Sequence, residues 1–144
     1  MINSQDFIET IIVIPTYNEA DNLPKIVKEI SSLGINNIGF IIIDDGSPDG
    51  TGKIADKISN EFPGFFKVIH REEKMGLGTA YVEGFRCAIE SKARKIIQMD
   101  ADFSHPPKEL IKINDLLDSS DIVVGSRYID NGSVDPNWSL LRKS

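Results

Sequence analysis

The chain has 144 residues, of which 40% are hydrophobic and 26% are charged, and its net charge at pH 7 is −6. This size and composition indicate one soluble globular domain with a hydrophobic core of its own. The acidic balance argues against a protein that coats nucleic acid, because that function needs a basic face. One cysteine, Cys87, excludes an internal disulfide framework and a cysteine-rich zinc site.

No segment has the features of a membrane span or a secretory signal. The sequence holds no run of about 18 or more apolar residues, the length a helix needs to cross a bilayer. The N-terminal segment MINSQDFIET lacks a basic stretch followed by an apolar one. We therefore expect a cytoplasmic protein, and the cysteine content is compatible with a reducing compartment.

Five short apolar runs, rich in β-branched residues, predict strands that are buried on both faces of a sheet. In chain order they are Ile11–Ile14, Phe40–Ile43, Phe66–Ile69, Ile96–Met99 and Ile122–Val124. The four segments between them have apolar stripes at helical spacing, which begin at Leu23, Ile54, Tyr81 and Leu110. Strands that alternate with helices predict an α/β fold, with a mostly parallel sheet and helices on both of its faces.

Polar and glycine-containing segments follow each predicted strand. In chain order they are Pro15–Glu19 (PTYNE), Asp44–Thr51 (DDGSPDGT), His70–Thr79 (HREEKMGLGT), Asp100–Pro107 (DADFSHPP) and Gly125–Tyr128 (GSRY). In open α/β sheets, ligands bind outside the carboxyl ends of the strands. This edge of the sheet is therefore the predicted site.

Asp100 and Asp102 are the first candidate ligands for a metal ion. In an extended chain, side chains two positions apart point the same way. Mg²⁺ takes one or two protein carboxylates and completes its shell with water and substrate phosphates. In the alternative, the two aspartates are a helix cap and a solvated loop acid before a helix that begins near Pro106, and Ser104 could be the cap equally well. Spacing alone favours the metal only modestly, because D-x-D is short and common.

A second acidic cluster, Asp44, Asp45 and Asp49, follows the second predicted strand. A tight turn and a helix cap would account for part of it, but a turn does not need two aspartates directly after a buried strand. A carboxylate here could instead accept hydrogen bonds from ribose hydroxyls or from a base edge. Tyr17 could offer a flat face to a base, or be a half-buried loop aromatic.

Other familiar sites have little support. The sequence contains no G-x-x-x-x-G-K-[ST] motif, so a P-loop is excluded. Gly76 and Gly78 match the dinucleotide-binding motif only weakly. They could lie at the N-terminus of a helix whose backbone N–H groups face an anion. His70 and His105 are expected to be ordinary loop residues.

Taken together, the segments IIVIPTYNEADNL, IIIDDGSPDGT, GLGTAYVEGF, QMDADFSHPP and VVGSRY resemble the inverting family 2 glycosyltransferases of the GT-A fold. More narrowly, they are similar to the dolichol-phosphate (polyprenol-phosphate) mannosyltransferases. The SPDGT and DADFSHPP segments favour that branch over relatives that transfer glucose or aminosugars. All the motifs occur in order between about Ile11 and Arg142.

The resemblance implies a role for each residue of the site. Asp100 and Asp102 would hold Mg²⁺ or Mn²⁺ against the diphosphate of a nucleotide-sugar, GDP-mannose. Arg127 would contact phosphate with bidentate geometry, and Arg142 would receive the phosphate of the lipid acceptor, dolichyl or polyprenyl phosphate. Asp102 and Arg127 would be the catalytic residues. The rest of the nucleotide pocket would consist of Pro15, Tyr17, Glu19, Ile43, Asp45 and the backbone of Ala101.

The implied reaction is a direct displacement at the anomeric carbon of mannose, with inversion, to give a β-linked mannosyl phosphate lipid that feeds protein glycosylation. The second pKa of a phosphate monoester is about 6, so the acceptor is already mostly dianionic and needs no strong general base. The metal would stabilise charge on the departing nucleoside diphosphate.

The resemblance also predicts how the chain is organised. We expect residues 1–144 to form a single GT-A domain whose acceptor part is incomplete, because the catalytic domain of the family continues beyond Ser144. Members of the family carry membrane helices or recruit membrane partners, so the expected location is the cytosolic face of a membrane. Two alternatives stay open: a nucleotide-sugar-binding module without full transfer activity, and a family 2 transferase that uses a UDP-sugar.

Overall fold

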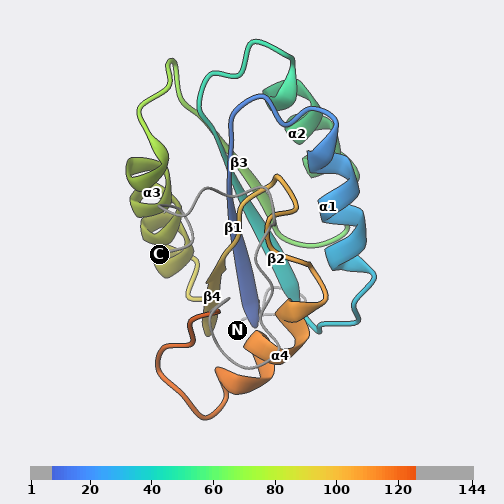
Figure 1. The fold of residues 1–144 in the computed structure, drawn as a ribbon, viewed down its shortest axis with the longest axis vertical. Helices are drawn as coiled ribbons and strands as arrows, with labels where there is room; N and C mark the ends of the chain where they lie inside the picture. The colour runs from blue at the N-terminus through green and yellow to red at the C-terminus, as the bar shows by residue number, and fades with distance from the viewer. Residues whose placement is uncertain (1–7, 126–144) are drawn as a thin grey trace, which may run out of the picture.

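The computed structural model describes residues 8–125, which form a parallel sheet of four strands flanked by helices (Figure 1). The elements in chain order are β1 (Thr10–Thr16), α1 (Asn22–Ser31), β2 (Ile38–Asp44), α2 (Thr51–Glu61), β3 (Phe66–His70), α3 (Leu77–Glu90), β4 (Lys95–Gln98) and α4 (Glu109–Leu116). Four predicted strands and four predicted helical segments are thereby confirmed, within a few residues at their ends.

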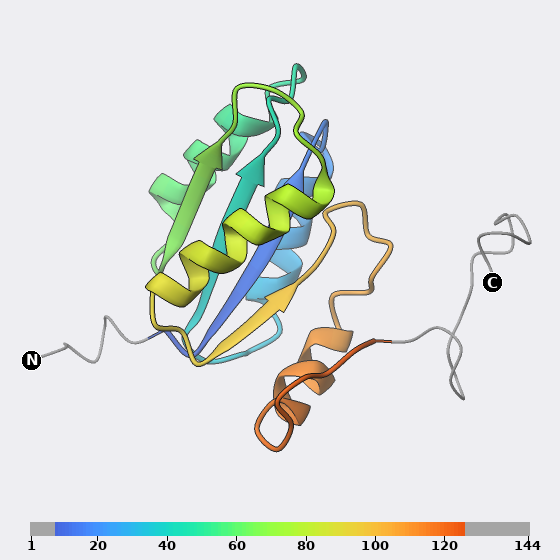
Figure 2. The same ribbon diagram turned by 90° about the vertical axis from the view of Figure 1, so that its left-hand side faces the viewer.

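The strand order β3-β2-β1-β4 places β1 and β2 in the middle of the sheet. The chain adds strands in one direction from β1 to β3, and then α3 carries it back across the sheet to β4, on the other side of β1 (Figure 2). The strand order therefore reverses between β1 and β4. Such switch points are where open α/β sheets bind ligands, because the loops after the two strands diverge there.

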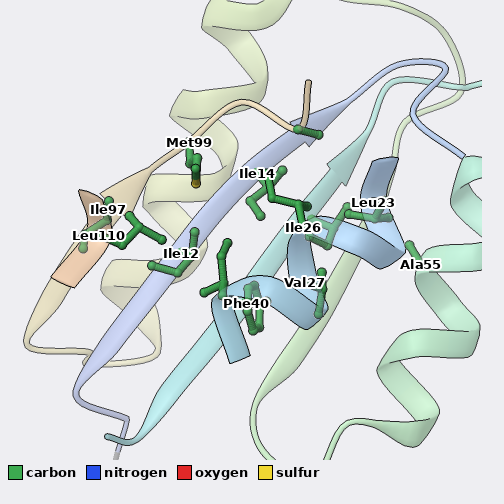
Figure 3. Close-up of a cluster of buried hydrophobic side chains, with 13 residues drawn as sticks. Ile12, Ile14, Leu23, Ile26, Val27, Phe40, Ala55, Ile97, Met99 and Leu110 are labelled. Atoms are coloured by element: carbon green, nitrogen blue, oxygen red, sulfur yellow. The ribbon is translucent and has the colours of Figure 1, made fainter. Parts of the chain in front are cut away.

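The sheet has a hydrophobic cluster on each face. The larger one includes Ile12 and Ile14 of β1 and Phe40 of β2, which pack against α1, α2 and α4 (Figure 3). Ile11 and Val13 of β1 point to the opposite face and pack against α3. Since both faces are covered, the strands carry uninterrupted apolar runs, as the sequence predicts.

Helix α3 lies close to the sheet because Gly84 has no side chain. A Cβ atom at this position would lie 2.4 Å from Cγ1 of Val13 and 2.8 Å from Cδ1 of Ile43. Ala80 and Ala88, on the same face of the helix, are also buried. Small residues thus fix the distance between α3 and the strands beneath it.

The predicted fifth strand is wrong for the residues that the structure describes. Ile122–Val124 is irregular, and Ile122 and Val124 are 81% and 80% exposed. A β-branched run forms a strand only when a neighbouring strand hydrogen-bonds to its backbone N–H and C=O groups. Within residues 8–125, no strand lies beyond β4 at that edge of the sheet. In this same range, no helix combines the length and apolar character that a membrane crossing requires.

Candidate functional site

A hollow of about 280 Å³ opens at the carboxyl ends of β1, β2 and β4. Seven of the predicted site residues line it: Pro15, Tyr17, Glu19, Asp45, Asp100, Ala101 and Asp102. Thr16, Lys74, Leu77 and Ala80 complete the lining, the last three from the loop before α3 and its first turn. The hollow therefore lies at the switch point between β1 and β4.

A larger hollow of about 410 Å³ lies at the opposite, amino-terminal edge of the sheet and holds none of the predicted residues. Its buried cation, Lys95, lies 2.9 Å from a carboxylate oxygen of Asp118 and donates a hydrogen bond of 3.0 Å to the carbonyl of Asn114. The polar groups of the larger hollow are thus paired with one another. The candidate site residues lie in the smaller hollow.

Asp100 and Asp102 both reach the smaller hollow from the loop after β4. The Tyr81 hydroxyl donates a hydrogen bond of 2.5 Å to Oδ1 of Asp100. The N–H of Ser104 donates a hydrogen bond of 2.9 Å to Oδ1 of Asp102, within a turn in which Phe103 has a positive φ of 60°. Partial burial alone would raise the pKa of Asp102, but the bonds from Ser104 outweigh it and hold that pKa below its usual range. Asp102 is therefore an anion at neutral pH.

The capping alternative is wrong for the helix that it invoked. Helix α4 begins at Glu109 rather than near Pro106, and Lys108 occupies its N-cap position without a side-chain bond. Asp102 stabilises its own turn, and neither aspartate caps α4. Both aspartates line the hollow, from the loop that follows β4.

Two of the three aspartates after β2 stabilise loops. Asp44 accepts hydrogen bonds from the hydroxyls of Thr16 and Ser47, at 2.9 and 2.7 Å. Asp49 accepts from the N–H of Thr51, at 3.0 Å, and a hydrogen bond from the Thr51 side chain is the main cause that lowers the pKa of Asp49. For these two aspartates the turn-and-cap interpretation is correct.

Asp45 differs because it lines the hollow and also forms a buried ion pair with Arg71. Arg71 also donates hydrogen bonds to Oγ1 of Thr79, at 2.8 Å, and to the carbonyl of Gly76, at 3.0 Å. The N–H of Gly76 lies 3.3 Å from the second oxygen of Asp45. Arg71 thus joins the end of β2 to the start of α3. An arginine directly after the third apolar run was the signal in the sequence, because a buried guanidinium requires a partner.

Lys74 is the second residue that the sequence interpretation missed. Its ammonium nitrogen lies 4.2 Å from the centroid of the Tyr17 ring, a cation–π contact at the wall of the hollow. Tyr17 is 38% exposed, so its ring is accessible to a ligand. In the sequence Lys74 follows two glutamates, so nothing marked it as a site residue rather than one of several surface charges.

Among the described residues, one predicted site residue, Ile43, does not line the hollow. The side chain of Ile43 is fully buried against α3, so only its backbone could approach a ligand. Arg127 and Arg142 lie outside the described residues.

The charges of the hollow define what it can bind. Its lining contains the carboxylates of Glu19, Asp45, Asp100 and Asp102 against one lysine. Within residues 8–125, no three acidic, histidine or cysteine side chains group closely enough to hold a metal ion alone. A metal at Asp100 and Asp102 would therefore need ligands from water or from a bound phosphate, as Mg²⁺ sites commonly do.

Comparison with known proteins identifies the relatives of this chain. Residues 11–143 match the profile of the family described as "Glycosyl transferase family 2". The chain is 42% identical over 134 residues to the polyprenol monophosphomannose synthase of Mycolicibacterium smegmatis. It is 39% identical to the undecaprenyl-phosphate mannosyltransferase of Micrococcus luteus and 38% identical to the dolichol-phosphate mannosyltransferase of Pyrococcus furiosus.

These alignments cover 92%, 91% and 92% of this chain and 50%, 53% and 36% of the respective relatives. The chain therefore spans about half, or less, of the length of the curated relatives it matches.

Two solved structures share the fold. One is the mannosyltransferase PcManGT from Pyrobaculum calidifontis in complex with GDP-Man and Mn²⁺, with a TM-score of 0.64 and 19% identity over 78% of this chain and 33% of that chain. The other is S. aureus TarS 1–349, with a TM-score of 0.59 and 20% identity over 76% of this chain and 32% of that chain. These similarities confirm the predicted α/β fold of the GT-A class.

Proposed function

Because this chain belongs to glycosyl transferase family 2, we propose that it forms the donor-binding part of an enzyme that transfers mannose from GDP-mannose to dolichyl or polyprenyl phosphate. Relatives named for undecaprenyl- and dolichol-phosphate mannosyl transfer support this assignment. The observation that carries it is the hollow at the switch point. Asp100 and Asp102, after β4, line it together with Tyr17, after β1, and Asp45, after β2.

The electrostatics of the hollow support a donor that brings a divalent cation. A nucleoside diphosphate is an anion. Of the four carboxylates that line the hollow, Asp45 is neutralised by its ion pair with Arg71, but the other three against one lysine would still repel the diphosphate. A cation held between the carboxylates and the diphosphate converts this repulsion into attraction. The acidic hollow is therefore compatible with an anionic donor only when a metal binds with it.

Asp100 and Asp102 fit such a cation as protein ligands. Asp102 is held ionised by the bonds from Ser104. Tyr81 engages one oxygen of Asp100, and no described residue hydrogen-bonds the other. Mg²⁺ commonly uses one or two carboxylates together with substrate phosphates, and PcManGT binds Mn²⁺ with GDP-Man. When bound, a divalent cation would stabilise the charge that develops on the departing GDP.

The side of the hollow near β1 and β2 would hold the nucleoside. Asp45 can accept a hydrogen bond from a ribose hydroxyl or a base edge through the oxygen that Gly76 approaches at 3.3 Å. Tyr17 offers an exposed ring, Glu19 and Pro15 line the same wall, and Ala101 borders the diphosphate side. Lys74 can exchange its contact with Tyr17 for a donor phosphate.

Transfer itself would be a direct displacement with inversion by an oxygen of the acceptor phosphate. That phosphate is mostly dianionic at neutral pH, since its second pKa is about 6, so Asp102 need not act as a base. We assign Arg127 to the transferring centre and Arg142 to the acceptor phosphate. The acceptor requires a site at a membrane surface, so we propose peripheral association with its cytosolic face, directly or through a membrane-anchoring partner.

Calorimetry tests the donor assignment. GDP-mannose, UDP-glucose and UDP-N-acetylglucosamine are titrated into the chain, each with and without Mn²⁺. We expect GDP-mannose to bind most tightly, and only with the metal. Tighter binding of either UDP-sugar would overturn the donor assignment and favour a transferase with a different sugar.

A transfer assay with polyprenyl phosphate and labelled GDP-mannose separates an enzyme from a binding module. Formation of a mannosyl phosphate lipid supports the enzyme. Metal-dependent donor binding without product would show that this chain binds the donor but does not transfer the sugar.

A further inference from the structure

Tyr81 donates a hydrogen bond to Asp100, one of the two carboxylates proposed to hold the metal ion. Tyr81 belongs to the first turns of α3, whereas Asp100 follows β4. Their side chains meet at 2.5 Å, at the short end of the usual range for a hydroxyl that donates to a carboxylate. We propose that Tyr81 is a positioning residue for Asp100: its hydroxyl holds Oδ1, so that the other oxygen is presented to a divalent cation. This inference rests on the proposed function.

Packing leaves the Tyr81 side chain little freedom. Its ring is stacked on that of Phe85, with the two centroids 6.1 Å apart and the planes inclined by 22°. Both rings pack against the cluster that includes Ile11 and Val13 of β1. The hydroxyl therefore occupies a position that the hydrophobic core determines, and a carboxylate bound to it is fixed with it.

The backbone that carries Tyr81 is fixed as well. Gly84 lies three positions after Tyr81, on the turn of α3 that approaches Val13 and Ile43 most closely. Ala80, next to Tyr81, is buried and also borders the hollow. The small residues that set the distance between α3 and the sheet thereby also set the reach of the Tyr81 hydroxyl.

The Tyr81 hydroxyl donates its hydrogen bond to one carboxylate oxygen of Asp100, and within residues 8–125 no side chain other than that of Tyr81 donates to Asp100. Groups that orient a metal ligand in this way typically change metal affinity by about 10- to 100-fold when they are removed.

Tyr81→Phe tests this role because it keeps the ring and removes only the hydroxyl. Mn²⁺ is titrated in the presence of saturating GDP, and the free ion is followed by electron paramagnetic resonance. We expect the Mn²⁺ affinity to fall by about 10-fold or more. The affinity for guanosine, which has no phosphate and needs no metal, should stay unchanged in calorimetry, and so should the cooperative melting of the fold.

Phe85→Leu is the matched control, since it disturbs the ring stack but leaves the hydroxyl in place. It should lower the melting temperature and leave Mn²⁺ affinity within about 2-fold of the unsubstituted chain, far less than the loss expected from a removed orienting group. Equal losses of Mn²⁺ affinity in both variants would overturn the inference, because packing rather than the hydrogen bond would then be responsible.

The test also separates this inference from the proposed function. If the unsubstituted chain binds no Mn²⁺ with GDP, the proposed metal site fails and the inference fails with it. If that chain binds Mn²⁺ and Tyr81→Phe binds it equally well, the inference alone is wrong.

Discussion

The ammonium nitrogen of Lys74 lies 4.2 Å from the centroid of the Tyr17 ring, at the wall of an otherwise acidic hollow. At an exposed site a cation–π contact contributes about 0.5–1 kcal/mol. A hydrogen bond to a charged group contributes about 1.5–3 kcal/mol. We therefore expect a ligand phosphate to compete successfully for Lys74, and the departure of Lys74 to free the Tyr17 ring for a base.

We expect Lys74→Gln to weaken binding of GDP-mannose with Mn²⁺ by about tenfold, or about 1.4 kcal/mol. Binding of guanosine, which has no phosphate, should change far less. Calorimetry with both ligands measures the difference. The control is Lys57→Gln, an exposed lysine on α2 away from the hollow, which should bind both ligands normally. An equal loss for guanosine and GDP-mannose would exclude a phosphate contact.

Asp100→Asn and Asp102→Asn should each reduce donor binding with Mn²⁺ to the level measured without metal. Neither side chain belongs to the hydrophobic core, so both variants should keep the far-ultraviolet circular dichroism and the cooperative melting of the parent chain. Asp115→Asn makes the same chemical change on the exposed surface of α4 and should bind the donor normally. If both site variants bound the donor with normal metal dependence, Asp100 and Asp102 would not be the ligands of the metal ion.

Arg71→Met should destabilise the fold by about 3–5 kcal/mol, because it leaves the buried carboxylate of Asp45 without its partner. Arg94→Met is the surface counterpart: Arg94 is 60% exposed in its ion pair with Glu9, and its loss should cost less than about 1 kcal/mol. Urea unfolding of the two variants gives the comparison. Similar costs for the two arginines would mean that the Asp45–Arg71 pair adds no more than a surface ion pair.

Gly84→Ala should lower stability, because the added methyl group meets Val13 and Ile43 and overpacking costs about 1–3 kcal/mol. Gly78→Ala, in the same helix, places its methyl group in open space, with no described neighbour within 4 Å. This second variant should gain up to about 1 kcal/mol from helix propensity. Thermal unfolding of the pair checks the sign of each effect. A stabilised Gly84→Ala would show that α3 can move away from the sheet.

The sequence predicts the fold, and it also predicts the edge of the sheet where the candidate site residues gather, because both depend on local patterns. Apolar runs mark the strands, and in a parallel sheet the segments after them must meet at one edge. Ile122–Val124 has the same pattern as the other runs, but no described strand pairs with it, and pairing is a tertiary property.

The individual roles of the acidic residues were harder to predict. Asp44 and Asp45 are adjacent and chemically identical, yet Asp44 stabilises the loop through Thr16 and Ser47, whereas Asp45 reaches the hollow. Which of the two pairs with Arg71 depends on the register of β2 and β3 and on the start of α3. Contacts between residues this far apart in sequence leave no local periodicity from which they could be inferred.

The strand order gives the two halves of the site unequal mechanical support. β1 and β2 each have a strand on both sides, but within residues 8–125 the four-residue β4 is paired only with β1. Edge elements open locally at lower free energy than central ones. Amide hydrogens of β4 should therefore exchange with solvent faster than those of β1, and a metal-bound donor should slow exchange at β4 most. The half of the hollow that carries Asp100 and Asp102 would thus become rigid only when the donor and its metal ion are bound.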